Sequence, residues 1–145
     1  MSRPGPSVFT VGYEGRRQED VVQLLVDARV QRLIDVRWRP LSRKRGLSKT
    51  ALSAALEAVG IDYFHDRRLG TPPELMHQLR TEGAYDWDEY AAHLAGAPDA
   101  VAEATVLATD RRTALLCYEA NPQECHRLLV GQAIVASGDF GLHHI

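Results

Sequence analysis

The sequence has few of the features that mark secreted, membrane-spanning or cofactor-dependent proteins. Its two cysteines, Cys117 and Cys125, are too few for a disulfide framework, which favours a reducing, cytoplasmic location. No run of about 18 apolar residues occurs, so no membrane span and no membrane partner are expected, and residues 1–6 lack the apolar core of a signal peptide. Neither G-x-G-x-x-G nor G-x-x-x-x-G-K-[ST] is present, so we expect no nucleotide cofactor.

The overall composition is that of an ordinary globular protein, but its positive charge is concentrated in one place. The chain has 145 residues, of which 45% are apolar and 25% charged, which predicts a single domain over 1–145 with a flexible N-terminus at 1–6. The net charge is only −2, yet the segment 37–49, called here the basic segment, holds six cations and no acid. Such a cluster attracts phosphate or nucleic acid, and the alternative is a merely solvated loop.

Strand-like and helix-like patterns alternate along the chain. Apolar and β-branched runs predict strands at 7–12, 32–36, 61–64, 113–118 and 142–145. Apolar stripes with helical spacing predict helices at 18–28, 48–59, 74–80, 87–94, 99–109 and 121–136, the second beginning at Ser48 as N-cap. This order predicts an α/β three-layer sandwich, with a mostly parallel sheet of four to five strands and helices on both faces.

The loops that follow the predicted strands contain the residues with chemistry. Ligands bind open parallel sheets outside the carboxyl ends of the strands, and here those ends lead into loops rich in charge or glycine. The opposite connections, such as the one around Gly60, are blander. We therefore expect a site at this edge, and its candidate ligand-binding residues are Gly12, Tyr13, Arg37, Ser42, Arg43, Tyr118 and Arg127.

Three residues at this edge are candidates for proton transfer. Asp35 lies two residues before Arg37 on a strand, so both side chains point to one face, where Asp35 acts as a base or orients the arginine. Glu119 and His126 are the other two, the latter beside Arg127 near the start of a helix, where amide groups and an arginine favour anions. The alternative for Asp35 and Arg37 is a salt bridge that fixes the loop.

The two cysteines have both a chemical and a plain interpretation. Cys117 ends an apolar strand and Cys125 lies near a helix start, where a thiolate is favoured, but cysteines in such settings more often pack as small apolar residues. Together with His126 they lack the close cysteine or histidine pair of a zinc site, so we expect no metal.

Four motifs together resemble the DUF488 family, a family named only as a domain of unknown function. These are Thr10-Val11-Gly12-Tyr13-Glu14-Gly15-Arg16, then Leu33-Ile34-Asp35-Val36-Arg37 with Pro40-Leu41-Ser42-Arg43, then Gly60-Ile61-Asp62-Tyr63 with Leu69-Gly70, and Cys117-Tyr118-Glu119 with Pro122 and Cys125-His126-Arg127. The sequence departs from this pattern at Leu47, where the family often has phenylalanine. The resemblance implies an α/β sandwich with a site built from these motifs, and it implies no reaction.

Three functional hypotheses follow from these residues. The leading one is an enzyme that acts on a phosphate-bearing ligand, either a nucleotide or nucleic acid, by a hydrolytic or glycosidic rather than a redox step. The second is a non-catalytic nucleic-acid-binding module that uses the basic segment. The third is a thiol- or metal-dependent protein that uses Cys117, Cys125 and His126.

Overall fold

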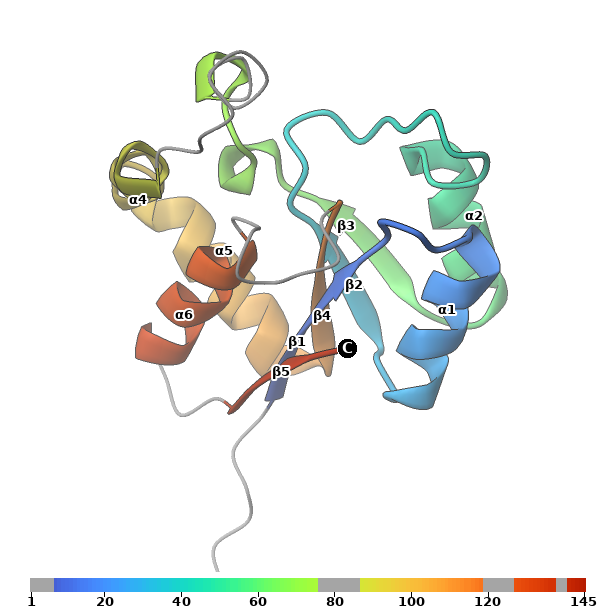
Figure 1. Ribbon diagram of the computed structural model, residues 1–145. Helices are drawn as coiled ribbons and strands as arrows, with labels where there is room; N and C mark the ends of the chain where they lie inside the picture. Colours follow the sequence, from blue (N-terminus) through green and yellow to red (C-terminus); the bar gives the residue numbers. More distant parts are fainter. Residues whose placement is uncertain (1–6, 76–86, 119–126, 138–140) are drawn as a thin grey trace, which may run out of the picture.

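The fold is described by a computed structural model that covers residues 7–75, 87–118, 127–137 and 141–145. Its centre is a sheet of five parallel strands in the order β3-β2-β4-β1-β5 (Figure 1). The strands are β1 (Ser7–Gly12), β2 (Arg32–Asp35), β3 (Asp62–His65), β4 (Thr113–Cys117) and β5 (Gly141–His144).

Helices cover both faces of this sheet. They are α1 (Gln18–Asp27), α2 (Lys49–Ala58), α4 (Trp87–Ala95), α5 (Pro98–Asp110) and α6 (Arg127–Ser137), with a short 3-10 turn η1 (Arg67–Leu69) after β3. Figure 1 shows α1 and α2 on one side of the sheet and α4, α5 and α6 on the other. No helix in the described part of the chain is long and apolar enough to cross a bilayer. The predicted three-layer α/β sandwich is therefore confirmed.

The burial of each strand explains its place in the sheet. All five residues of β4 are buried, as expected for the central strand of a parallel sheet covered on both faces. The side chains of Leu33, Ala114 and Leu116 pack toward α1 and α2, whereas those of Ile34 and Leu115 pack toward α4, α5 and α6. Two separate apolar cores result, one on each face.

The helices follow the predicted spacing closely. On α2, Leu52 and Leu56 lie one turn apart and are both fully buried against the sheet. On α5 the buried positions are alanines spaced four residues apart, which lets this helix approach the sheet closely. Most of the helix expected at 74–80, and the first part of the one expected at 121–136, lie outside the described residues.

One local prediction is only half right. Ser48 occupies the N-cap position of α2, but its side chain forms no capping hydrogen bond. Its hydroxyl instead accepts from the backbone N–H of Ser42 at 3.0 Å and donates to the Ser42 carbonyl at 3.3 Å. A contact within the basic segment has therefore replaced the local cap.

Candidate functional site

The strand β2 ends in a buried ion pair. The Arg37 guanidinium donates from Nε to Oδ1 of Asp35 at 2.9 Å and from Nη2 to Oδ2 at 2.7 Å, so the contact is bidentate. Asp35 is fully buried and Arg37 is 6% exposed. Burial by itself lowers the pKa of Arg37, but the hydrogen bonds and charge of Asp35 outweigh it and raise that pKa, so the guanidinium stays charged.

Two tyrosines and a carbonyl complete the surroundings of this pair. The Tyr63 hydroxyl donates to Oδ2 of Asp35, and Nη1 of Arg37 donates to the Leu47 carbonyl at 2.7 Å and to the Tyr13 hydroxyl at 3.4 Å. The pKa of Tyr63 is raised by burial and by the charge of Asp35, and that of Tyr13 is raised by burial. All three guanidinium nitrogens of Arg37 therefore donate to protein atoms.

The ends of the central strands meet as expected, but their side chains divide between the two faces. The backbone N–H of Val36 donates to the Leu116 carbonyl at 3.1 Å, which places β2 beside β4. Asp35 and Arg37 face α1 and α2, whereas the buried Cys117 packs with the core under α4, α5 and α6. Tyr118 is exposed, and its ring lies edge-on to Tyr13 with 5.2 Å between the centroids.

A second group of polar residues lies near the other face at the same edge. Arg127 opens α6 and is 1% exposed, and Nδ1 of His144 on β5 is hydrogen-bonded to the Thr10 hydroxyl. Burial, then the charges of Arg127 and His143, lower the pKa of His144. His144 is therefore mainly neutral near pH 7.

Three predicted site residues, Glu119, Cys125 and His126, lie outside the described residues. The roles suggested for them stay predictions, as do the catalytic role of Asp35 and the ligand-binding role of Arg37. Within the described ranges no three histidine, cysteine, aspartate or glutamate side chains come together as a metal site would require.

The basic segment folds back on itself and is pinned at its base. The backbone N–H of Lys49 donates to the Pro40 carbonyl at 2.8 Å, and that of Lys44 donates to the Ser42 hydroxyl at 3.1 Å. With the Ser42–Ser48 contacts, these bonds order the loop. Arg43 is exposed on it.

Beside this segment lies a hollow of about 740 Å³, called here the cationic cleft. One wall is the loop after β1 with the start of α1, and the other is the end of the basic segment with the start of α2. The residues that line it are Gly15, Arg16, Arg17, Gln18, Glu19, Lys44, Arg45, Gly46 and Ala51. Its volume lies within the range of small-molecule sites.

Two side chains tie the walls of the cleft together. Nζ of Lys44 donates to the carbonyls of Tyr13 at 3.0 Å and Arg16 at 3.4 Å, and Nε2 of Gln18 donates to those of Gly46 at 2.7 Å and Ala51 at 3.3 Å. These bonds satisfy four backbone carbonyls and join the two walls of the cleft.

The cations of the cleft are not neutralised by the described part of the chain. Within the described ranges no Asp or Glu side chain forms an ion pair with Arg16, Arg17, Lys44 or Arg45, and the one acid that lines the cleft is Glu19. Arg16 donates from Nη1 to the Gly12 carbonyl at 2.8 Å and to an oxygen of Ile145 at 3.3 Å. By contrast, Arg32, Arg68 and Arg111 all pair with carboxylates. The cleft therefore has a net positive charge and is suited to a ligand with more than one negative charge.

Sequence reasoning identified both walls of this cleft but did not bring them together. The loop 12–16 and the basic segment were each noted for glycine or charge, yet only the folded chain shows that they face each other. The glycines at positions 15 and 46 were the signal that the sequence offered for this approach. In the structure both have positive φ, a backbone conformation that favours a residue without Cβ. His144 was included only in the strand expected at 142–145.

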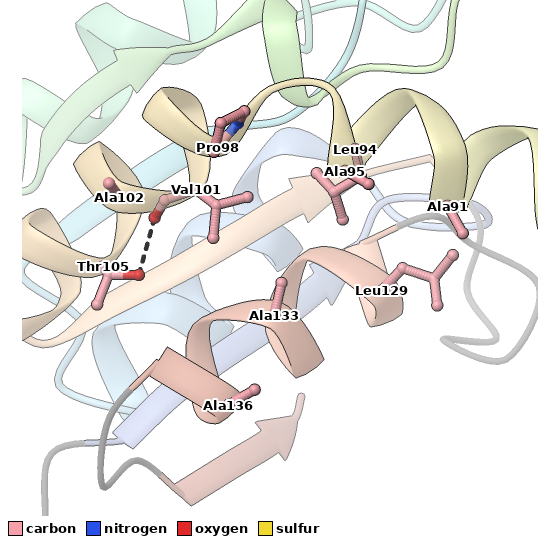
Figure 2. A pocket seen from close by; sticks show the side chains of 10 residues that line it. All are labelled: Ala91, Leu94, Ala95, Pro98, Val101, Ala102, Thr105, Leu129, Ala133 and Ala136. Carbon is pink, nitrogen blue, oxygen red and sulfur yellow. Dashed lines mark hydrogen bonds between the residues drawn. The ribbon is translucent and has the colours of Figure 1, made fainter.

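A second hollow, of about 670 Å³, has a different character. Figure 2 shows the ten side chains that line it, which come from α4, α5 and α6. All are apolar except Thr105, whose hydroxyl donates to the Val101 carbonyl at 2.8 Å. None of the predicted site residues lies in this apolar groove.

The fold and the edge site define an all-parallel α/β sandwich protein with polar groups gathered at the carboxyl ends of its strands. The family model of the domain of unknown function DUF488 matches residues 17–134, which is most of the chain, and the protein belongs to this family. No curated protein and no solved structure matches the chain.

Proposed function

We propose that this protein binds a phosphate-bearing ligand, a nucleotide or nucleic acid, in the cationic cleft. The observation that carries the proposal is the set of four cations on the cleft walls, none of which is paired with an Asp or Glu side chain of the described residues. Phosphate groups fit this arrangement because arginine binds them in a fork and lysine as a point charge. Arg43 and Lys49 extend the positive surface beyond the cleft.

The arrangement around Arg37 supports a placement of the ligand different from the one expected from sequence. Arg37 donates to Asp35, Leu47 and Tyr13, so its guanidinium is already engaged. Arg17 and Arg45 are exposed on the cleft walls, so a ligand that arrives from solvent can reach them.

The test is a binding titration with a short fluorescein-labelled oligodeoxythymidylate and, separately, with ATP. Arg17→Ala and Arg45→Ala should each weaken binding severalfold and lower the slope of log K against log salt by about 1 for the oligonucleotide. Arg111→Ala is the control, because it removes an equal charge at the opposite edge of the sheet. No saturable binding of either probe, or an equal loss with Arg111→Ala, would refute the proposal.

A hydrolytic or glycosidic step is the second candidate, and the observation that favours it is His144, which lies outside the cationic cleft near the other face of the sheet. A neutral imidazole that lies in the field of Arg127 combines a proton acceptor with a cation, which acid–base catalysis near pH 7 can use. Incubation of ATP and of the oligonucleotide, with chromatography of released phosphate, base or shorter strands, tests this. Turnover that His144→Gln abolishes would support catalysis, and the absence of any product would leave binding as the function.

A further inference from the structure

The contribution of the buried Asp35–Arg37 ion pair to the stability of the fold does not by itself explain why an ion pair occupies this place. Taking both charges out of water costs much of what their attraction returns, so apolar residues of similar size often stabilise a core as well as an ion pair does. What an ion pair adds is direction, because its hydrogen bonds fix where each partner group lies. The groups that Arg37 fixes are therefore informative.

One of these groups belongs to the basic segment. Nη1 of Arg37 donates to the carbonyl of Leu47, which directly follows the cleft residues Lys44, Arg45 and Gly46. This bond closes the chain from Arg37 to Leu47 into a loop. The side chain of Leu47 is fully buried in the core under α1 and α2, so the end of the loop is held by both its backbone and its side chain.

The other group belongs to the opposite wall of the cleft. The Arg37 guanidinium lies over the Tyr13 ring, 5.3 Å from its centroid, and Nη1 also donates to the Tyr13 hydroxyl. Tyr13 begins the loop that continues into Gly15 and Arg16, and its carbonyl accepts a hydrogen bond from Nζ of Lys44. One buried guanidinium therefore contacts the loops that form both walls.

Asp35 sets the orientation of that guanidinium. It holds Nε and Nη2, which leaves Nη1 directed toward Leu47 and Tyr13, and it also accepts the backbone N–H of Arg37 at 3.1 Å. The Tyr63 hydroxyl on β3 fixes the carboxylate in turn. The chain of contacts thus runs from the sheet through Asp35 and Arg37 to the cleft.

We infer that Asp35 and Arg37 are positioning residues for the cationic cleft: their ion pair sets the separation of its two walls through Leu47 and Tyr13. The inference rests on the proposed function for what the cleft does, but the positioning itself concerns the geometry of the chain without ligand. Arg37 acts on a ligand through Lys44 and Arg45, which it helps to place, and does not touch the ligand itself.

The experiment compares Arg37→Lys and Tyr63→Phe with Val130→Ala, all measured well below their melting temperatures. Lysine keeps the charge but cannot hold Asp35 and Leu47 together, and phenylalanine removes only the hydrogen bond to Asp35. Val130→Ala is the matched control, because it removes buried apolar volume from the core on the opposite face of the sheet.

Two readouts separate positioning from general destabilisation. The rate of amide hydrogen exchange at residues 44–48, measured without ligand, should rise about tenfold in Arg37→Lys. It should rise less in Tyr63→Phe and should not change in Val130→Ala. Affinity for the labelled oligodeoxythymidylate should fall about tenfold in Arg37→Lys and stay at the parent value in Val130→Ala. This difference should persist even where the melting temperature falls by the same amount in the two variants.

The outcomes are distinct for the two proposals. Unchanged exchange at 44–48 in both Arg37→Lys and Tyr63→Phe would overturn the positioning role, as would raised exchange with undiminished affinity. If the parent protein binds neither oligonucleotide nor ATP, the proposed function fails, and the exchange data alone then decide whether the pair holds the walls. If Arg37→Lys does not fold, Tyr63→Phe decides by the same criteria.

Discussion

The side chains of Asp35 and Arg37 form a closed unit at the end of β2, in which one carboxylate oxygen accepts from both the backbone N–H and Nε of the arginine, at 3.1 and 2.9 Å. The two-residue spacing places both side chains on one face, as alternation along a strand predicts. Because this face is covered by α1 and α2, the unit is sealed from solvent. Removing half of it should therefore be far more costly than removing a surface pair.

Asp35→Asn should destabilise the protein by about 3–5 kcal/mol, since it leaves the Arg37 guanidinium buried without its counter-charge. The free energy of unfolding from urea titration measures this. Asp110→Asn is the control, because Asp110 is 62% exposed and its pair with Arg32 should contribute at most about 1 kcal/mol. Equal losses in the two variants would mean that Asp35 and Arg37 are more hydrated than their burial indicates.

The position of this pair illustrates what the sequence could predict. The apolar run at 113–118 predicted the strand β4, and the spacing of Asp35 and Arg37 predicted a shared face, because both depend on local sequence patterns. Both alternatives for the pair, a ligand site or a salt bridge, were compatible with that spacing. The structure shows the salt bridge under α1 and α2, and the catalytic role expected of Asp35 and the ligand-binding role expected of Arg37 stay predictions.

The cationic cleft could not have been predicted in the same way. Its walls come from residues 15–19 and 44–51, and their approach depends on tertiary bonds from Lys44, Gln18 and Arg37. Ser48 shows the same limit on a smaller scale. Its sequence context fits an N-cap, but the nearby Ser42 backbone offers its hydroxyl a different partner.

Gly46→Ala should damage the cleft as well as the fold, and Gly60→Ala should affect the fold alone. Both glycines have positive φ, 85° and 78°, so alanine should cost about 1–2 kcal/mol of unfolding free energy at each. At Gly46 the added Cβ would also lie 2.8 Å from Nε2 of Gln18, which must move and give up its bond to the Gly46 carbonyl. At Gly60 the added atom meets nothing within 4 Å.

Urea unfolding and oligonucleotide titration together measure this difference. Gly46→Ala should lower the free energy of unfolding by about 1 kcal/mol more than Gly60→Ala does, because it also loses a hydrogen bond. It should bind the oligonucleotide more weakly than the parent protein does. Gly60→Ala should bind like the parent protein. Equal affinity in the two variants would show that Gln18 and Gly46 do not set the width of the cleft.

His144 should make the protein less stable in mild acid. Because the pKa of His144 is lowered in the folded chain, the unfolded chain binds more protons as the pH falls below the ordinary histidine value of 6.5. The stabilising contribution of the neutral imidazole is thus complete above pH 6.5 and is lost as the pH falls through the folded-state pKa. Protonation would also place a positive charge near Arg127 and His143, the two groups whose charges oppose it.

Replacement of His144 by glutamine isolates this contribution from those of the other titrating groups. Glutamine retains a polar side chain that can bond to the Thr10 hydroxyl but cannot titrate. From a pH well above 6.5 to one well below it, the parent protein should lose more unfolding free energy than His144→Gln, as measured by urea titration at each pH. His143→Gln changes the neighbouring residue, which is exposed as His144 is, and should retain most of the pH dependence of the parent, because burial contributes more than the charge of His143 to the lowered pKa of His144. Parallel stability profiles for the parent and His144→Gln would show that this imidazole titrates alike in the folded and unfolded chains.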